Sequence, residues 1–326
     1  MDKWLLDHLV CPRDGRKLEL IGDRLVCEGD HKYPVVDNIP VMLIDEAEST
    51  HGYIEQTLAA LAAGDIESET AVAETDGIDP FVQAEVPYTS GNLYFPIQHK
   101  LTRYPIPKTH LWQGSGERLL DIGCNWGRWS IAAARKGFKP IGIDPSLKAV
   151  MAARRVARQL NEQATFIVGD ARFLPFENDS FDVVFSYGVY QHLSKENVRL
   201  SLKEVRRVLK DKGQTLFQMP NKFGIRQYQQ HRRRGFTEGK DFEVRYWKPS
   251  ELMQTFSEYI GSTQMITDCY FGLGVQVSDI DLMPLKYKAV IAASETLRKL
   301  STVVRPLMKL ADSVYLKSVN EKSSDK

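Results

Sequence analysis

The sequence has few of the features that mark secreted, membrane-spanning or nucleic-acid-coating proteins. Four cysteines in 326 residues are too few for a disulfide scaffold. The longest stretch without Asp, Glu, Lys or Arg, 86–99, is too short and too polar for a transmembrane helix. The start carries Asp2 and Asp7 and lacks the apolar core of a signal peptide. The formal net charge is only +1, so no overall field favours nucleic acid. We therefore expect a cytoplasmic protein.

Charge is unevenly distributed along the chain, and this distribution suggests how the chain is divided into domains and linkers. Residues 45–85 hold eleven acids and neither Lys nor Arg, which predicts a solvated linker, helical in part at 53–63. Residues 222–248 hold eight Lys or Arg against three acids. The expected divisions are a small β-rich domain at 1–45, an acidic linker at 46–85, an α/β domain at 86–285 with a basic insertion at 220–248, and a helical extension at 286–326.

The central region alternates short apolar strands with helical patterns. Strands are expected at 118–122, 140–144, 165–168, 181–186 and 214–219, with a turn at 210–213 before the last. Helices are expected at 128–136, 147–160 and 195–209. This alternation predicts an α/β fold with a doubly wound, mostly parallel sheet, in which a ligand binds at the carboxyl ends of the strands.

The turn after the first of these strands has the pattern of a nucleotide-type site. In the run Asp121-Ile-Gly-Cys-Asn-Trp-Gly127, Gly123 lets the backbone approach a ligand and Gly127 lets helix and strand pack closely. Asp144 ends the second strand, where an acid accepts hydrogen bonds from ribose hydroxyls. Asp170, after the third strand, is placed to accept a hydrogen bond from an adenine amino group.

Five motifs in order resemble the class I S-adenosylmethionine-dependent methyltransferases, closest to the methyltransferase type 11 group. They are DIGCNWG, GIDPS, VGDARFLPF, FDVVFSYGVYQHL and RVLKDKG, between 121 and 213. The resemblance implies S-adenosylmethionine as cofactor and a Rossmann-like fold. It implies that Asp121 and Gly123 hold the methionine end and Asp144 the ribose. Further cofactor-binding candidates from the same motifs are Cys124, Asn125, Gly127, Pro145, Asp170, Ala171 and Ser186.

Methyl transfer from a sulfonium needs in-line positioning, and a base only where the acceptor must lose a proton. The candidates for that base are His192, which titrates near neutrality, and Tyr190. The acceptor pocket is expected from two irregular segments, the aromatic stretch 88–107 and residues 220–247. In the second, Arg232–Arg234 would clamp a phosphate or carboxylate, or would form a solvated helix face.

Residues 5–44 resemble a small zinc-ribbon-like family whose members activate methyltransferases. The match includes Cys11-Pro12, Tyr33-Pro34 and the run 37–43. A structural zinc ribbon has two C-x₂-C pairs, whereas here the pairs read Cys11…Asp14 and Cys27…Asp30, with His31 adjacent. Zinc could still bind Cys11 and Cys27 with Asp14 and with Asp30 or His31. Because carboxylates are poorer partners in structural sites, the sequence favours a domain without metal.

The leading functional prediction is a methyltransferase that acts on an oxygen or nitrogen of a small-molecule or glycan-type acceptor. RNA or protein remains the alternative acceptor class, because of the N-terminal resemblance and Arg232–Arg234. A catalytically silent binding or scaffold protein is the alternative from another class. The basic segment 286–318 predicts amphipathic helices interrupted at Pro306, which pack on the catalytic domain or a second subunit, or touch an anionic membrane. The sequence does not specify an oligomeric state.

Overall fold

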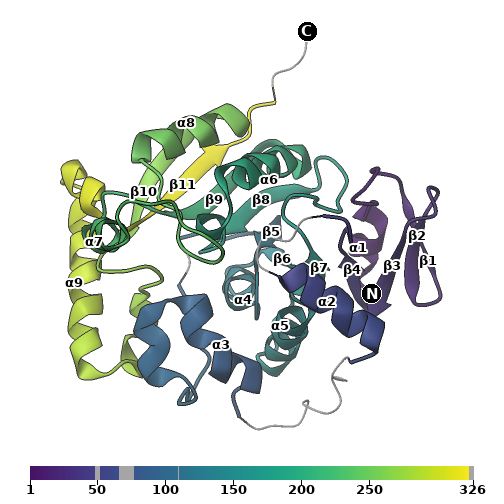
Figure 1. The fold of residues 1–326 in the computed structure, drawn as a ribbon, viewed down its shortest axis with the longest axis horizontal. Helices are drawn as coiled ribbons and strands as arrows, with labels where there is room; N and C mark the ends of the chain where they lie inside the picture. The colour runs from purple at the N-terminus through teal and green to yellow at the C-terminus, as the bar shows by residue number, and fades with distance from the viewer. Residues whose placement is uncertain (48–51, 66–76, 109, 323–326) are drawn as a thin grey trace.

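An eleven-stranded mixed sheet runs through the whole molecule (Figure 1). The computed structural model describes residues 1–47, 52–65, 77–108 and 110–322. The strand order is β1-β2-β3-β4-β7-β6-β5-β8-β9-β11-β10. In chain order the strands are β1 Leu18–Ile21, β2 Arg24–Cys27, β3 Lys32–Val36, β4 Ile39–Met42, β5 Arg118–Ile122, β6 Lys139–Asp144, β7 Thr165–Gly169, β8 Phe181–Ser186, β9 Leu209–Pro220, β10 Thr263–Cys269 and β11 Ser313–Val319.

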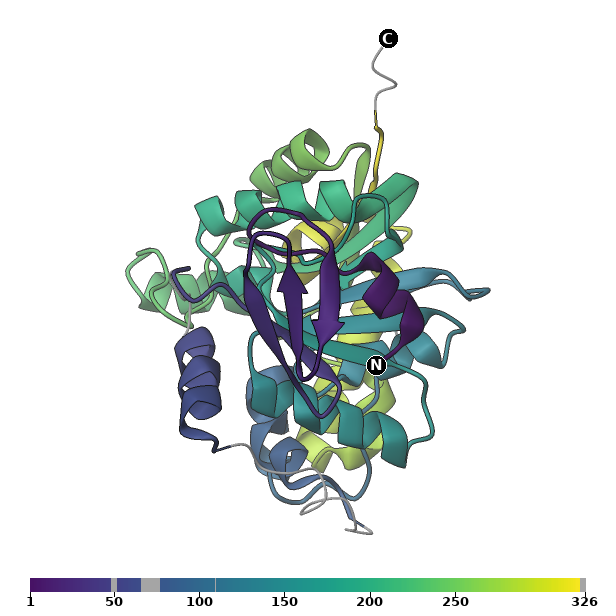
Figure 2. The same cartoon turned by 90° about the vertical axis from the view of Figure 1, so that its right-hand side faces the viewer.

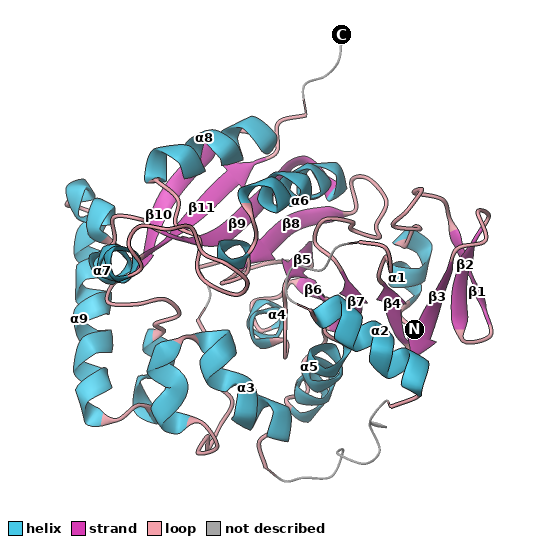
Figure 3. Ribbon diagram, in the orientation of Figure 1, coloured by secondary structure: helices cyan, strands magenta, loops and turns pink. Residues whose placement is uncertain are grey.

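Helices cover both faces of the sheet (Figure 3). In Figure 3, α4 and α5 lie on one side and α6 and α8 on the other. The α-helices are α1 Lys3–His8, α2 Tyr53–Ala63, α3 Pro80–Ser90, α4 Arg128–Ala134, α5 Leu147–Gln159, α6 Lys195–Val208, α7 Ile225–Arg233, α8 Pro249–Tyr259 and α9 Leu285–Ser301. The longer 3₁₀ helices are η2 Asn92–Ile97, η4 Val277–Leu282 and η5 Arg305–Leu310, and the short η3 is Tyr190–His192.

The parallel centre of the sheet agrees with the expected α/β fold. Strands β7, β6, β5, β8 and β9 pair in parallel, and β11 and β10 complete that end in antiparallel fashion. Their central residues are almost all buried because helices cover both faces, as parallel strands require. The order reverses between β5 and β8, so the carboxyl end of β5 is the switch point where ligands bind.

The N-terminal segment is not separated from the rest of the fold, in contrast to the expected division at 45. Strands β1 to β4 form an antiparallel meander (Figure 2), but β4 pairs in parallel with β7 through Val41 and Val168. Leu5 and Leu25 share one hydrophobic core with Ile167. A non-local strand pairing of this kind leaves no signal in local periodicity, so sequence patterns do not reveal it.

Two further segments differ from the expectations. Residues 286–326 are not a purely helical extension, because β11 inserts between β9 and β10 after α9 and η5. The expected turn at 210–213 is a bend inside β9, where Lys212 has a φ of 59°. The expected helix at 53–63 is present as α2. In the described part of the chain, no helix is long and apolar enough to cross a membrane.

Candidate active site

A cavity of about 790 Å³ opens at the carboxyl ends of β5, β6, β7 and β8. Its volume lies within the range of small-molecule and cofactor sites. We call the wall formed by the ends of β5, β6 and β7 the cofactor half. The acceptor half is the wall formed by η3, α7 and the segment 242–246. Residues of α3, η2 and the turn 271–274 complete the enclosure.

The cofactor half contains several of the candidates. Those on the cavity wall are Gly123, Asn125, Asp144, Pro145, Asp170 and Ala171. Asp144 closes the turn, since its Oδ2 accepts from the Asn125 N–H at 3.0 Å and its Oδ1 from the Ser146 N–H at 3.0 Å. Burial raises the pKa of Asp144 to about 6, and these two donors oppose that rise. The carboxylate oxygens keep lone pairs for ribose hydroxyls, so the residues present fit the nucleoside part of S-adenosylmethionine.

Gly123 occupies a position that only glycine tolerates. Its φ is +73°, and an added Cβ would lie 2.2 Å from a methyl carbon of Val189, which also lines the cavity. The backbone of this turn therefore forms the cavity surface directly. Gly127 serves packing instead, because an added Cβ there would lie 2.9 Å from the Phe166 ring.

Four other cofactor candidates lie behind the wall. These four are buried and absent from the lining: Asp121, Cys124, Gly127 and Ser186. Asp121 accepts a 2.6 Å hydrogen bond from Ser130 Oγ, and burial raises its pKa to about 7. Ser186 Oγ donates to the Ile122 carbonyl at 2.9 Å. In this structure, therefore, the Asp121 and Ser186 side chains support the turn and do not line the cavity.

Asp170 also has a protein partner. Arg172 contacts both of its oxygens, with distances from Nη2 to Oδ2 of 2.6 Å and from Nε to Oδ1 of 3.1 Å. A hydrogen bond from an adenine amino group would have to share this carboxylate with the arginine. The motif did not reveal this partner, although Arg172 is only two residues further along the chain.

The two catalytic candidates differ in position. His192 lines the cavity, and its ring stacks on Phe242 with 4.0 Å between centroids. Tyr190 is fully buried and does not line the cavity; its hydroxyl contacts Ser201 Oγ, which in turn donates to the Ala171 carbonyl. Tyr190 therefore packs beneath the cavity, so the structure does not support it as a catalytic residue.

Sequence reasoning missed the amide side chains that line the acceptor half. Gln191 and Gln227 are 8% and 1% exposed, and the Oε1 atom of each is buried without a hydrogen-bond partner among the described residues. Ser90 Oγ, on the α3 side of the cavity, is in the same condition. Buried polar atoms without a partner are uncommon and costly, so these three atoms are exceptions within the described residues. Single glutamines carry no pattern by which the sequence could identify them.

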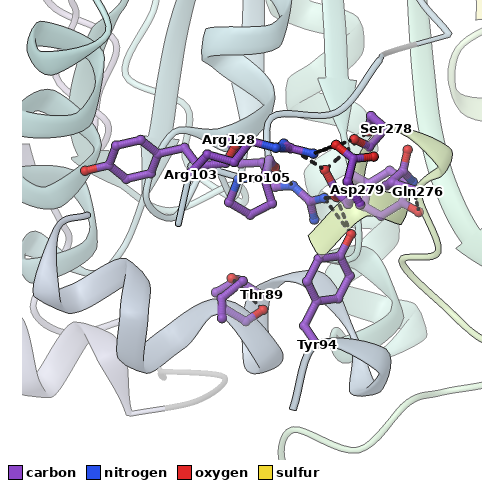
Figure 4. Close-up of polar contacts among 12 residues, drawn as sticks. Thr89, Tyr94, Arg103, Pro105, Arg128, Gln276, Ser278 and Asp279 are labelled. Atoms are coloured by element: carbon purple, nitrogen blue, oxygen red, sulfur yellow. Dashed lines mark hydrogen bonds and ion pairs between the residues drawn. The ribbon is translucent and has the colours of Figure 1, made fainter. Parts of the chain in front are cut away.

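A buried ion pair holds the enclosing segment in place (Figure 4). Arg128, at the start of α4, lies 2.6 Å from Asp279 Oδ2 of η4 and donates to the Pro105 carbonyl at 2.7 Å. Tyr94 of η2 donates to the same Asp279 carboxylate and accepts from Arg128. The network joins η2, α4 and η4, which are distant in the sequence. It therefore fixes the aromatic segment expected to cover the pocket against the nucleotide-type turn.

The N-terminal candidates for zinc gather away from the cavity. Cys11, Asp14, Cys27 and His31 offer ligand atoms that all lie within 4.8 Å of one another. Both thiols lie 3.4 Å from His31 Nδ1, and Asp14 Oδ2 lies 3.8 Å from the Cys27 Sγ. Asp30 is not part of the group; it is exposed and pairs with Lys32. Two thiolates, an imidazole and a carboxylate are donors that Zn²⁺ accepts in tetrahedral sites, so this group fits that metal.

Comparison with known proteins agrees with this geometry. A family model described as a methyltransferase domain matches residues 119–213, from β5 to the bend in β9. A demethylmenaquinone methyltransferase of Bacillus velezensis is 32% identical over 162 residues, which cover 46% of this chain and 67% of that protein. The chain belongs to the S-adenosylmethionine-dependent methyltransferase family.

Other members of this methyltransferase family match over shorter segments. An uncharacterized methyltransferase of Bacillus subtilis, YcgJ, is 36% identical over 100 residues, 30% of this chain. The chain spans 39% of YcgJ and 50% of an uncharacterized methyltransferase of Synechocystis. A solved structure of a SAM-dependent methyltransferase from Methanosarcina mazei has 18% identity and a TM-score of 0.47, and covers 68% of this chain and 99% of that one.

Proposed function

We propose that this methyltransferase transfers a methyl group to an oxygen or nitrogen of a small-molecule or glycan-type acceptor bound in the acceptor half. The observation that carries the proposal is that one cavity contains both halves, so that the cofactor half is continuous with a wall of aromatic rings and amide groups. A site of this kind buries a small ligand on most sides and fixes its orientation through a few polar groups. The formal net charge of +1 gives no overall field that would favour RNA as the acceptor.

The relatives support the same acceptor class. The names of several relatives describe small-molecule chemistry, including a ubiquinone biosynthesis O-methyltransferase of Agrobacterium fabrum, 35% identical over 88 residues. That match covers only 27% of this chain and 35% of that protein.

Bound S-adenosylmethionine supplies a methyl group already activated on a sulfonium. The protein has to hold the acceptor atom in line with that methyl and, for a hydroxyl or ammonium acceptor, remove a proton. Asp144 and the Gly123 turn fix the nucleoside part in the proposal. His192 lies on the wall of the acceptor half with its ring stacked on Phe242, and its Nε2 lies 3.0 Å from the Gln191 side-chain nitrogen. In the proposal this Nε2 takes the acceptor proton. Gln191 and Gln227, which also line the acceptor half, orient the acceptor in the proposal.

The test follows a labelled methyl group from S-adenosylmethionine into a fractionated cell extract. We expect label in the low-mass fraction, in material resistant to nuclease and protease, and no label with Asp144→Ala. An Asp211→Ala variant, changed at an exposed residue beside the bend in β9, is the matched control and should label as the wild type does. Label that nuclease or protease releases would show an RNA or protein acceptor and overturn the proposal.

A further inference from the structure

One face of helix α7 lines the cavity, and another face is exposed to solvent. Arg226, Gln230 and Arg234, spaced four residues apart, line the cavity. Gln227 and His231 form the face buried against the body of the protein. The opposite face carries Ile225 and Tyr228, whose exposed fractions are 44% and 46%. Nothing in the methyl-transfer reaction explains large apolar side chains on this outer face.

A second exposed apolar segment lies beside α7. Phe223, Val303, Val304 and Leu310 are also large and exposed, and the last three flank or end η5. The two segments touch directly, because Asn221 Nδ2 donates to the Lys309 carbonyl at 3.0 Å and to the Ala311 carbonyl at 2.8 Å. Figure 1 shows α7 end-on beside the yellow end of α9 that leads into η5. We call residues 222–237 with 302–311 the α7–η5 surface.

The charge on the α7–η5 surface has one sign. Residues 222–237 contain five Lys or Arg and no acid, and residues 302–311 contain Arg305 and Lys309 and no acid. Arg232, Arg233, Arg305 and Lys309 are exposed. Of the acids that adjoin these ranges, Asp312 is fully buried and accepts from the Arg226 and Gln227 N–H groups. Glu238 is exposed at one edge of the surface, and Glu243 lies 3.5 Å from Arg234. Apolar side chains set among exposed cations are typical of a surface that rests on anionic lipid headgroups.

We propose that the α7–η5 surface docks this protein on the face of an anionic lipid bilayer. The charge of the surface favours a lipid bilayer over a second copy of the chain as its binding partner. A two-fold contact through this surface would bring its cations against the same cations of the partner, whereas anionic headgroups neutralise them. Since α7 also forms part of the cavity wall, docking places the acceptor half next to the bilayer. The docking itself does not depend on the proposed reaction.

Vesicle flotation of the full chain tests the proposal. The probes are vesicles of phosphatidylcholine with phosphatidylglycerol, and vesicles of phosphatidylcholine alone, each at low and high salt. We expect binding to the anionic vesicles only, weakened by salt because exposed charges are screened. The variant R232E/R233E should lower the partition coefficient about tenfold or more, since each basic residue near an anionic surface contributes about a fivefold factor. Ile225→Glu should also weaken binding through the apolar face.

Matched controls lie on α6, far from this surface in the fold. R199E/K203E reverses two exposed charges, and Leu200→Glu replaces an exposed apolar side chain; both should float as the wild type does. Equal flotation with neutral vesicles, no flotation of the folded wild type, or equal loss in the control variants would overturn the proposal. Sedimentation velocity gives one further contrary result. In that result the wild type is a dimer, the R232E/R233E variant is a monomer, and neither protein binds vesicles. The surface would then be an interface between two copies of the chain.

Discussion

Asp121 and Asp144 end neighbouring parallel strands, and burial raises the pKa of both carboxyls. Only Asp144 reaches the cavity. Asp121 is 1% exposed and has Ser130 Oγ as its partner, so its charged form gains little to offset its desolvation. The two residues thus differ in position: Asp144 lines the cavity, whereas Asp121 supports the turn behind it, at a free-energy cost that grows when Asp121 ionises.

The free energy of unfolding should show that cost as a pH dependence. The pKa of Asp121 rises from 3.8 to about 7 on folding, so between these values the native state binds more protons than the unfolded state. Stability from this group is therefore present at low pH and lost as pH rises through 7. Urea unfolding at several pH values should give Asp121→Asn a flatter profile, with a difference on the order of 4 kcal/mol across the window. An unchanged slope would contradict the assignment.

His192 and Tyr190 form a natural pair for testing the base. His192→Gln should lower kcat about a hundredfold or more and remove the acidic limb of the pH–rate profile, while cofactor affinity stays unchanged. Tyr190→Phe loses only a buried hydrogen bond to Ser201 and should cost about 1 kcal/mol of stability without changing that profile. Steady-state kinetics with the acceptor from the labelling experiment separates the two. A normal pH profile in His192→Gln would remove histidine from the mechanism.

At the scale of elements, the Arg128–Asp279 ion pair holds three separate segments together. Its side chains are 3% and 0% exposed, and it connects η2, α4 and η4 (Figure 4). Arg103 and Asp281 form a neighbouring pair whose side chains are 40% and 71% exposed. Breaking a buried pair leaves one charge without a partner in a poorly solvated position, whereas an exposed pair exchanges its partner for water. The two aspartates thus provide an internal comparison.

Thermal and chemical unfolding should separate those two pairs clearly. Asp279→Ala is expected to destabilise the protein by about 3–5 kcal/mol, because Arg128 stays buried and charged. Asp281→Ala should cost less than about 1 kcal/mol. Similar losses in both variants would mean that Arg128 finds solvent or another partner when Asp279 is removed.

The cluster near β2 and β3 gives a prediction about metal. Cys11, Asp14, Cys27 and His31 should hold about one zinc ion per chain, measured by elemental analysis of protein purified without chelator. Cys27→Ser should lose the metal, whereas Asp30→Asn should keep it because Asp30 lies outside the cluster. Zinc at the same level in Cys27→Ser and the wild type, or its absence from both, would show that the four side chains form no metal site.

For the whole molecule, local sequence patterns predicted the central sheet but could not predict strand pairings between residues far apart in the chain. The β5–α4 turn and strand β8 follow from short runs that carry their own signal, namely apolar strands with Gly123 and Asp144 at fixed offsets. The insertion of β11 and the pairing of β4 with β7 depend on contacts far apart in the chain. For the same reason the motifs identified Asp144 on the cavity, but not that Asp121 faces Ser130 or that His31 joins the cysteines.

Calorimetric titration of S-adenosylmethionine into the wild type and Asp144→Ala tests the central claim most directly. We predict micromolar binding by the wild type and a loss of affinity of tenfold or more in the variant, because hydrogen bonds to a carboxylate contribute about 1.5–3 kcal/mol. Asp211→Ala should bind as the wild type does. No binding by the folded wild type, or equal affinity in Asp144→Ala, would contradict the placement of the cofactor at the ends of β5 and β6.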